Sequence, residues 1–247
     1  MVSSASCVEL PFRVTTAAEE QAWNTEQLAN PVSEPRFRVW TYERAELVLG
    51  HLRMPQHGLS HRNAQVPIKR QSGGGAVLTG PWLVSASVVL PRCHPLAAHG
   101  VIESYRWLGE AHAEALRCFG ITALALSPQE IRSRRANESL DVRWACFGSL
   151  SPWEVVAGAG RKLVGLAQER RRNGLQLVAG TLISTPDWRL LADLMGQPAA
   201  YAGLLADCTT DCEWELGGSV PAADLANSLS EEIGRRLNEP RHSVSDS

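Results

Sequence analysis

The sequence predicts one α+β domain, because two groups of strand-like segments alternate with helix-like segments. The strand-like groups lie within residues 36–90 and 154–183, and helical patterns precede, separate and follow them. Short apolar runs bounded by glycine, proline and asparagine predict strands joined by tight turns. Such hairpin-rich groups with helices between them are typical of α+β domains. No internal repeat or low-complexity linker divides the sequence, so we expect a single domain over 1–240 and a disordered tail over 241–247.

The N-terminal part predicts a capped helix and then several short strands. Thr16 and Glu19 have the spacing of a capping box, which predicts a helix running to about Asn30. Residues 1–11 form a loose leader that is expected to contribute an edge strand. Alternating or continuous apolar residues predict further strands over 36–40, 46–50, 67–70, 76–78 and 84–90.

The last two of these strands are predicted to pair as a β-hairpin. The residues between them, Thr79, Gly80 and Pro81, are turn formers. Residues 51–65 are polar and poorly patterned, which indicates a loop or a short helix. Residues 127–143 are also polar and are expected to be a connection.

Three more helices are predicted downstream. The apolar residues of 105–119 share one helical face, and Gly120 ends that segment. A second helix is expected over 185–196, with proline at its first position. The third repeats an apolar residue every four positions and stops before Pro240; its apolar residues are Leu225, Leu229, Ile233 and Leu237.

The central stretch predicts three strands and places a lysine beside a flexible turn. Strands are expected over 154–157, 162–167 and 175–183, separated by a glycine turn and an Asn-Gly turn. Lys162 then lies at the mouth of the first hairpin. Gly165 and Ala167 follow it, and small residues on a strand indicate close approach of another group. Cys146 lies just upstream, so we consider Lys162 and Cys146 the candidate reactive pair.

Composition excludes several classes of function. A formal net charge of −2 argues against a nucleic-acid-binding protein, and the apolar runs are too short to span a bilayer. The six cysteines show no CxxC spacing, which argues against a zinc site or a disulfide framework. We therefore expect no metal site, and reduced thiols in a cytoplasmic protein.

Each candidate also has an ordinary structural interpretation. Three adjacent glycines, Gly73 to Gly75, can expose backbone N–H groups to a ligand or form only a sharp loop. A lysine near a turn is by default solvated, and Cys146 alone is more often a small buried apolar residue than a nucleophile. No serine-hydrolase, zinc-protease or P-loop motif is present.

Four segments taken together resemble the lipoate–protein ligase and octanoyltransferase family, which is related to the biotin protein ligase catalytic domain. They are Arg70-x-Ser72-Gly73-Gly74-Gly75-Ala76-Val77, Ala145-Cys146-Phe147, Arg161-Lys162-Leu163-Val164-Gly165-x-Ala167-Gln168 and Ala179-Gly180-Thr181-Leu182. The resemblance spans roughly residues 35–240. It implies a mixed, largely antiparallel sheet flanked by helices.

The resemblance also implies a set of site residues. Cys146 and Lys162 would be catalytic. The acyl group or substrate would be bound by Arg70, Ser72, Gly73, Gly74, Gly75, Ala76, Val77, Gly165, Ala167, Gln168 and Gly180. An ammonium about 4 Å from a thiol contributes about 4 kcal/mol at an effective dielectric of about 20. That exceeds the roughly 2 kcal/mol that lowers a thiol pKa from about 8.5 to near 7, so one lysine would suffice.

Two branches of the family fit these residues differently. In the cysteine-dependent octanoyltransferases a loop cysteine carries the acyl group as a thioester, and the spacing of Cys146 and Lys162 is similar. The donor would be an acyl carrier protein, the acceptor a lipoyl-domain protein (a glycine cleavage H protein or an E2 subunit), and no cofactor would be required. In the ATP-dependent lipoate–protein ligases the lysine contacts an acyl-adenylate, with ATP and Mg.

Three positions depart from the family pattern and keep alternatives open. Thr79-Gly80 stands where ligases carry His-Asp, which favours the transferase branch. Lys69 replaces the first arginine of an Arg-Arg pair, and Ala179 replaces a histidine. A non-catalytic protein that binds an acyl group or a carrier is therefore the alternative from another class.

Overall fold

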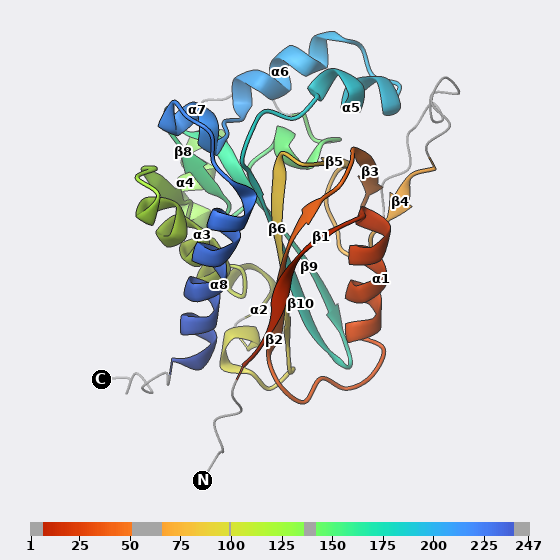
Figure 1. Cartoon of the computed structure of the whole chain (residues 1–247), viewed down its shortest axis with the longest axis vertical. Helices are drawn as coiled ribbons and strands as arrows, with labels where there is room; N and C mark the ends of the chain where they lie inside the picture. The colour runs from red at the N-terminus through yellow and green to blue at the C-terminus, as the bar shows by residue number, and fades with distance from the viewer. Residues whose placement is uncertain (1–6, 51–65, 99, 136–141, 240–247) are drawn as a thin grey trace.

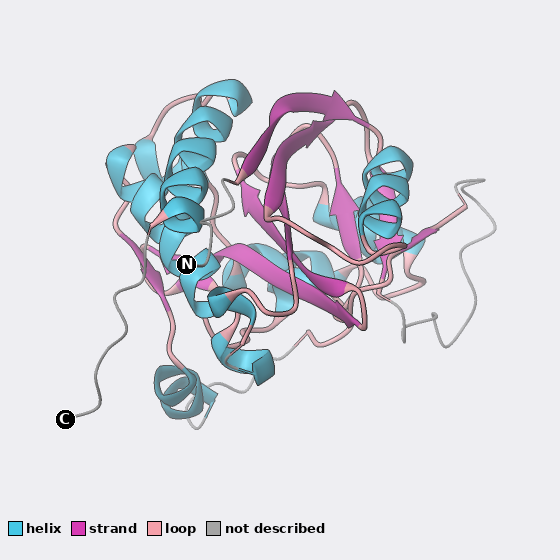
Figure 2. Cartoon of the chain, turned by 90° about the horizontal axis from the view of Figure 1, so that it is seen from below, coloured by secondary structure: helices cyan, strands magenta, loops and turns pink. Residues whose placement is uncertain are grey.

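The computed structural model describes residues 7–50, 66–98, 100–135 and 142–239. Figure 1 shows one large sheet that runs through the molecule, with helices on both of its faces. Figure 2, seen from below, shows the strands between a group of helices on one side and a single helix on the other. The predicted loop over 51–65 and the predicted tail over 241–247 lie outside the described residues.

The large sheet has seven strands in the order β1-β2-β6-β10-β9-β8-β7. Only β1 and β2 are parallel, and the other neighbours are antiparallel, so the predicted mixed, largely antiparallel sheet is confirmed. β1 is an edge strand, as expected for the leader, although it starts at Val8 and continues to Thr15. The other strands are β2 Arg36–Tyr42, β6 Leu83–Leu90, β7 Ala123–Ala125, β8 Val155–Ala157, β9 Arg161–Arg171 and β10 Gly174–Leu182.

The predicted hairpin over 76–90 is wrong, because its two strands belong to different sheets. β5 (Val77–Thr79) pairs with β3 (Glu46–Leu49), which also pairs with β4 (Ile68–Lys69) in a three-stranded sheet. β6 instead lies between β2 and β10 and is buried along its whole length. A three-residue strand could satisfy only part of the eight-residue β6, whereas the two long neighbours satisfy both of its edges.

The predicted capped helix is confirmed as α1 (Ala17–Gln27), with both hydrogen bonds of the capping box formed between Thr16 and Glu19. The other predicted helices are α3 (Arg106–Cys118), α5 (Trp188–Leu194) and α8 (Ala222–Asn238). α5 begins later than predicted, because Asp187 caps it by accepting a hydrogen bond from the N–H of Leu190.

Several elements were not predicted, and one corrects the expected polar connection over 127–143. Part of that connection is a helix, α4 (Pro128–Arg135), because Ser127 and Glu130 form the reciprocal hydrogen bonds of another capping box. The remaining unpredicted elements are β7, α2 (Gly100–Glu103), α6 (Ala200–Cys208), α7 (Cys212–Leu216) and the 3₁₀ turns η1 (Pro95–Ala97) and η2 (Cys146–Gly148).

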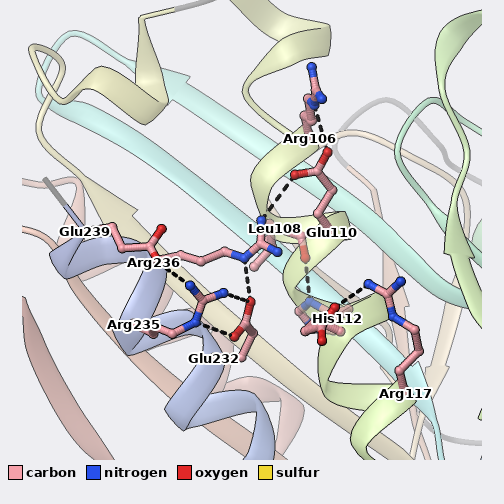
Figure 3. Close-up of polar contacts among 10 residues, drawn as sticks. Arg106, Leu108, Glu110, His112, Arg117, Glu232, Arg235, Arg236 and Glu239 are labelled. Carbon is pink, nitrogen blue, oxygen red and sulfur yellow. Dashed lines mark hydrogen bonds and ion pairs between the residues drawn. The ribbon is translucent and has the colours of Figure 1, made fainter. Parts of the chain in front are cut away.

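The two faces of the large sheet have different partners. α3 and α8 pack together on one face, and Figure 3 shows the charged side chains that join them. There Arg236 bonds to Glu232 on its own helix and to Glu110 on α3. α1 and the small sheet cover the other face. Among the described residues, no helix combines the length and the apolar character needed to cross a membrane.

Candidate active site

Lys162 is a buried residue of β9, so the default expectation of a solvated lysine is wrong. Its side chain is only 2% exposed. Its Nζ donates to the carbonyl oxygens of Cys146 at 2.7 Å and Ser149 at 2.8 Å. It also forms an ion pair with Glu154 Oε2 at 2.6 Å. The lysine therefore lies directly beneath the loop that carries the candidate nucleophile.

Glu154, the residue just before β8, is a buried carboxylate that balances the charge of Lys162. Its Oε2 accepts a hydrogen bond from the N–H of Ser151 at 2.7 Å, and its Oε1 accepts one from the N–H of Leu166 at 3.1 Å. Burial raises the pKa of this carboxyl, while the Lys162 ammonium and the two N–H groups act in the opposite direction. The two side chains thus form one hydrogen-bonded ion pair shielded from water.

Cys146 opens the 3₁₀ turn η2 and is half-buried. The glycine segment holds this turn by backbone bonds: Cys146 N donates to Ala76 O at 2.8 Å, and Ala76 N donates to Trp144 O at 2.7 Å. Gly75 permits these two backbone segments to come within hydrogen-bonding distance of each other. A Cβ at that position would lie 2.5 Å from Trp144 O and 2.8 Å from Cys146 N, which no side chain can occupy.

Gly165 leaves room between the lysine and the thiol. A Cβ at this position would lie 3.5 Å from Lys162 Cε and 3.7 Å from Cys146 Sγ. The two candidate residues therefore flank the same small space. The N–H groups of the lysine are directed at backbone carbonyls and at Glu154, so the field at the sulfur is that of an ion pair. Glu154 therefore offsets part of the roughly 4 kcal/mol that a lone ammonium would contribute at the thiol.

A cavity lies on the α1 face of the large sheet, with Cys146 in its wall. The cavity is partly open to solvent. Its floor is a row of small residues across three adjacent strands, Ser85 on β6, Gly180 on β10 and Gly165 on β9, which the register aligns. Small side chains here leave a groove above the sheet, because larger ones would fill it.

The structure brings most of the predicted site residues to this cavity. Those that line it are Arg70, Ser72, Val77, Cys146, Gly165, Ala167 and Gly180. Gly73, Gly74, Gly75 and Ala76 are not in the lining. Gly75 and Ala76 instead support the Cys146 turn, and Arg70 donates to the Gly75 carbonyl at 3.0 Å.

Gln168 lies apart from the other predicted substrate-binding residues. Successive residues of a strand point to opposite faces, so Gln168 faces away from Ala167 and the cavity. Its Nε2 donates to the carbonyl oxygen of Val101 at 2.6 Å, and its Oε1 accepts hydrogen bonds from Ser104 and Arg170.

The cavity has a polar end that was not predicted, formed by Glu20, Tyr42 and Ser85. Tyr42 Oη lies 2.7 Å from Glu20 Oε2 and 2.8 Å from Ser85 Oγ. Glu20 is 2% exposed, and burial raises the pKa of its carboxyl. A glutamate in the first turns of a capped helix is ordinarily solvated, so no signal in the sequence marks it as a cavity residue.

Glu154 was also not predicted as a site residue, although it is the first residue of the strand predicted over 154–157. Its role depends on its contact with Lys162, which only the pairing of β8 and β9 creates. Within the described ranges, no group of three or more His, Cys, Asp or Glu side chains is placed to hold a metal ion.

A half-buried thiol in the wall of a cavity can act as a nucleophile and hold an acyl group. The small-residue floor beside Gly165 gives such a group a space that begins at the sulfur. The buried ammonium of Lys162 lies beneath the same turn and donates a hydrogen bond to the Cys146 carbonyl oxygen. These are the components of an acyl-transfer site.

Comparison with curated proteins gives several octanoyltransferases called LipM, among them those of three organisms. That of Moorella thermoacetica is 39% identical over 119 residues, 48% of this chain and 40% of that protein. That of Kyrpidia tusciae is 38% identical over 133 residues, 53% of this chain and 46% of that protein. That of Staphylococcus aureus is 28% identical over 195 residues, 73% of this chain and 68% of that protein. The chain thus aligns with less than half the length of two of these relatives.

Solved structures confirm the predicted fold. Lipoate-protein ligase A bound with ATP matches with a TM-score of 0.66 and 16% identity over 94% of this chain and 85% of that one. The bi-partite lipoate protein ligase of Thermoplasma acidophilum, solved in a study of the ligase and its E2 lipoyl domain, matches with a TM-score of 0.67 and 16% identity over 94% and 83%. At these identities the likeness shows the fold alone.

The sequence profile of the lipoyl protein ligase A/B catalytic domain matches residues 14–234. That range includes every residue of the cavity and both members of the Cys146–Lys162 pair. Because the match covers most of the sequence, the chain belongs to the lipoyl protein ligase A/B catalytic domain family.

Proposed function

We propose that this chain is an acyltransferase of protein lipoylation that acts through a thioester on Cys146. It transfers an octanoyl or lipoyl group from a thioester donor to the lysine of a lipoyl-domain protein. The observation that carries the proposal is the position of Cys146 Sγ in the cavity wall, beside the space left by Gly165 and above Lys162. The names of the LipM relatives support the same activity.

The first chemical step forms the acyl-enzyme. The Cys146 thiolate attacks the carbonyl carbon of the donor thioester, the bond to the donor sulfur breaks, and the released thiolate takes up the proton that Cys146 lost. Exchange of one thioester for another needs no nucleotide, so this route requires no cofactor. The donor we propose is an acyl carrier protein.

The second step forms the product. The neutral lysine amine of the acceptor attacks the carbonyl carbon of the Cys146 thioester, a C–N bond forms and the C–S bond breaks. The proton lost by the amine passes to the Cys146 thiolate. In both steps Lys162 holds the turn that carries the reacting sulfur, through its hydrogen bonds to the carbonyl oxygens of Cys146 and Ser149. The proposed acceptor is a lipoyl-domain protein, as in the T. acidophilum study, which pairs its ligase with an E2 lipoyl domain. We place the reaction in the cytoplasm.

The deciding experiment is an intact mass measurement after incubation with octanoyl-acyl carrier protein, without ATP or acceptor. We expect a gain of one octanoyl group that hydroxylamine removes and that Cys146→Ala abolishes. Cys208→Ala is the matched control, because Cys208 is another half-buried thiol of the same region, with its Sγ 3.7 Å from the Phe147 carbonyl oxygen. That control should acylate at the wild-type rate.

Other results would assign one of the alternatives. If the acceptor is modified only with lipoate, ATP and Mg, and Lys162→Ala is inactive while Cys146→Ala is active, the chain is an ATP-dependent ligase. Binding of octanoate or of a carrier without turnover of either donor would indicate a non-catalytic binding protein. Full acceptor modification by Cys146→Ala would rule out the covalent route.

A further inference from the structure

The hydrogen-bonding capacity of Lys162 is fully used. A lysine ammonium has three N–H donors. Three acceptors lie within 2.8 Å of Nζ: the carbonyl oxygens of Cys146 and Ser149 and one oxygen of Glu154. The two carbonyls lie at the start of η2 and at the residue that follows it. The ammonium therefore ties together the two ends of the turn that carries Cys146.

The charge of Lys162 depends on Glu154. Both side chains are at most 3% exposed, and an ammonium in such a place without a counter-charge loses its proton instead of remaining charged. A neutral amine has only two N–H donors and binds carbonyl oxygens more weakly. Removal of the carboxylate would therefore loosen the bonds that hold the η2 turn.

Glu154 itself does not line the cavity. It bonds to Ser151 N, Leu166 N and Lys162, so it reaches the reacting atoms only through the lysine. Leu166 follows Gly165, so the carboxylate also holds the strand segment next to the space beside the thiol. Glu154 thus supports the η2 turn through Lys162 and the cavity floor through its hydrogen bond from the N–H of Leu166.

We propose that Glu154 is a positioning residue, which keeps Lys162 charged and in place and thereby sets the position and reactivity of Cys146. This inference rests on the proposed acyl transfer, since it assigns Glu154 to that site. Tyr105, just ahead of α3, is a further titratable group that interacts electrostatically with Glu154 and Cys146. Burial raises the pKa of Tyr105 to about 12, so its phenol stays neutral in the working range.

The test measures Cys146 in two independent ways. One is the rate of octanoyl-thioester formation from octanoyl-acyl carrier protein. The other is the rate of alkylation by iodoacetamide between pH 6 and 9, which needs no acyl donor. The variants are Glu154→Gln, Glu154→Asp, Lys162→Met and the double variant Glu154→Gln/Lys162→Met, all compared with the wild type. Glu215→Gln is the matched control, because this acid pairs with the neighbouring Arg161 at 3.5 Å.

We expect Glu154→Gln to slow both reactions at least tenfold at pH 7 and to displace the alkylation profile along the pH axis. KM for the donor should stay within twofold, because Glu154 does not contact the cavity. Glu154→Asp should recover part of the rate. In the Lys162→Met background, Glu154→Gln should have no further effect, since a residue that acts through the lysine has nothing left to position. Glu215→Gln should match the wild type.

Two results would overturn the inference: wild-type rates in Glu154→Gln, or a further tenfold loss in the double variant. If Glu154→Gln does not fold, Glu154→Leu/Lys162→Met removes both charges and leaves an apolar pair that buried sites tolerate. Wild-type alkylation in that variant would equally overturn it. Failure of the proposed function looks different, because the wild type would then form no thioester while the alkylation data still report on Glu154.

Discussion

The space beside Cys146 Sγ exists because residue 165 has no side chain. A Cβ there would make contacts of 3.5 to 3.7 Å with Lys162 Cε, Phe147 Cζ and Cys146 Sγ, which are ordinary van der Waals distances. The backbone of Gly165 does not need a positive φ, so alanine fits the strand. A methyl group would be compatible with folding and yet occupy the place where a carbonyl carbon must meet the thiol.

We therefore expect Gly165→Ala to leave the melting temperature within about 4 °C of the wild type, as for changes near 1 kcal/mol in a domain of this size. It should slow thioester formation at least tenfold, because a near-attack position is lost. Stopped-flow acylation with intact mass detection, beside thermal unfolding, measures both quantities. Gly203→Ala is the control, since a Cβ there meets nothing within 4 Å. Wild-type acylation in Gly165→Ala would show that the acyl group lies elsewhere.

At the residue scale the sequence predicted a candidate pair, Cys146 and Lys162, but not the environment of the two residues. Lys162 and Cys146 were identified from their positions near a turn and from the family resemblance, and the structure places them beside the same small space. The burial of Lys162 could not be predicted, because a lysine two positions after a glycine turn is usually solvated. Glu154 and Glu20 were missed for a related reason: a buried carboxyl is uncommon, and only the packing of distant segments shows that one is present.

Among the elements, the glycine segment and the η2 turn work as one unit. Gly75 lets the two backbones come within bonding distance, and Ala76 exchanges hydrogen bonds with the segment from Trp144 to Cys146. A glycine run in the sequence predicts an unusual backbone without showing its partner. The error in the predicted hairpin has the same origin, since the turn at Thr79-Gly80 passes the chain from one sheet to another.

Helix α3 contains a buried histidine that makes stability depend on pH. His112 is fully buried, and Figure 3 shows its ring bonded to the carbonyl oxygen of Leu108, at 2.8 Å from Nδ1. Nδ1 must therefore carry the proton, and Nε2 has no partner among the described residues. Burial lowers the pKa of His112 from 6.5 to about 4. The folded state thus favours the neutral ring.

The sign of the pH effect follows from this pKa difference. The unfolded chain takes up a proton on His112 as the pH falls through 6.5, whereas the folded protein resists protonation until about pH 4. The contribution of the neutral His112 ring to the free energy of unfolding is complete above about pH 6.5. It declines as the pH falls toward 4, by up to about 3 kcal/mol at 1.36 kcal/mol per pKa unit. Urea unfolding between pH 7.5 and 4.5 should show this decline.

His112→Leu should flatten that part of the profile, because it removes the group that titrates. His94→Gln is the control: His94 Nδ1 accepts a hydrogen bond from Leu96 N in the short η1 turn and lies outside α3. A slope that remains in His112→Leu and disappears in His94→Gln would assign the effect to the other histidine.

At the scale of the whole molecule, the large sheet separates the apolar core under α8 from the cavity on its other face. Phe37 on β2 contacts α8, and Val88 of β6 lies beside it on the same face. Ser85, Gly180 and Gly165 form the cavity floor on the opposite face. The α+β class and the antiparallel pairing could be predicted, the first from segment patterns and the second from resemblance. The strand order could not be predicted. β2 pairs with β6 although all three strands of the small sheet lie between them in the sequence, and no local sequence pattern indicates such a non-local pairing.

This division predicts that a core change under α8 alters stability without altering chemistry. Leu229 is fully buried in α8, and α8 packs on α3 and on β1, β2 and β6. Leu229→Ala removes buried methyl groups and leaves a cavity, so the free energy of unfolding should fall by about 2–5 kcal/mol. Urea unfolding measures this loss. At a temperature where the variant is folded, its rate of thioester formation should stay within twofold of the wild type.

Leu229→Ala and Gly165→Ala should therefore show opposite results in the same two assays. The first loses stability and keeps the acylation rate, and the second keeps stability and loses the rate. The contrast depends on the sheet acting as a rigid partition, since its central strands β6, β9 and β10 are paired along both edges. A tenfold fall in acylation by folded Leu229→Ala would mean that packing under α8 reaches through the sheet to Cys146. The cavity floor would then move with the core beneath it.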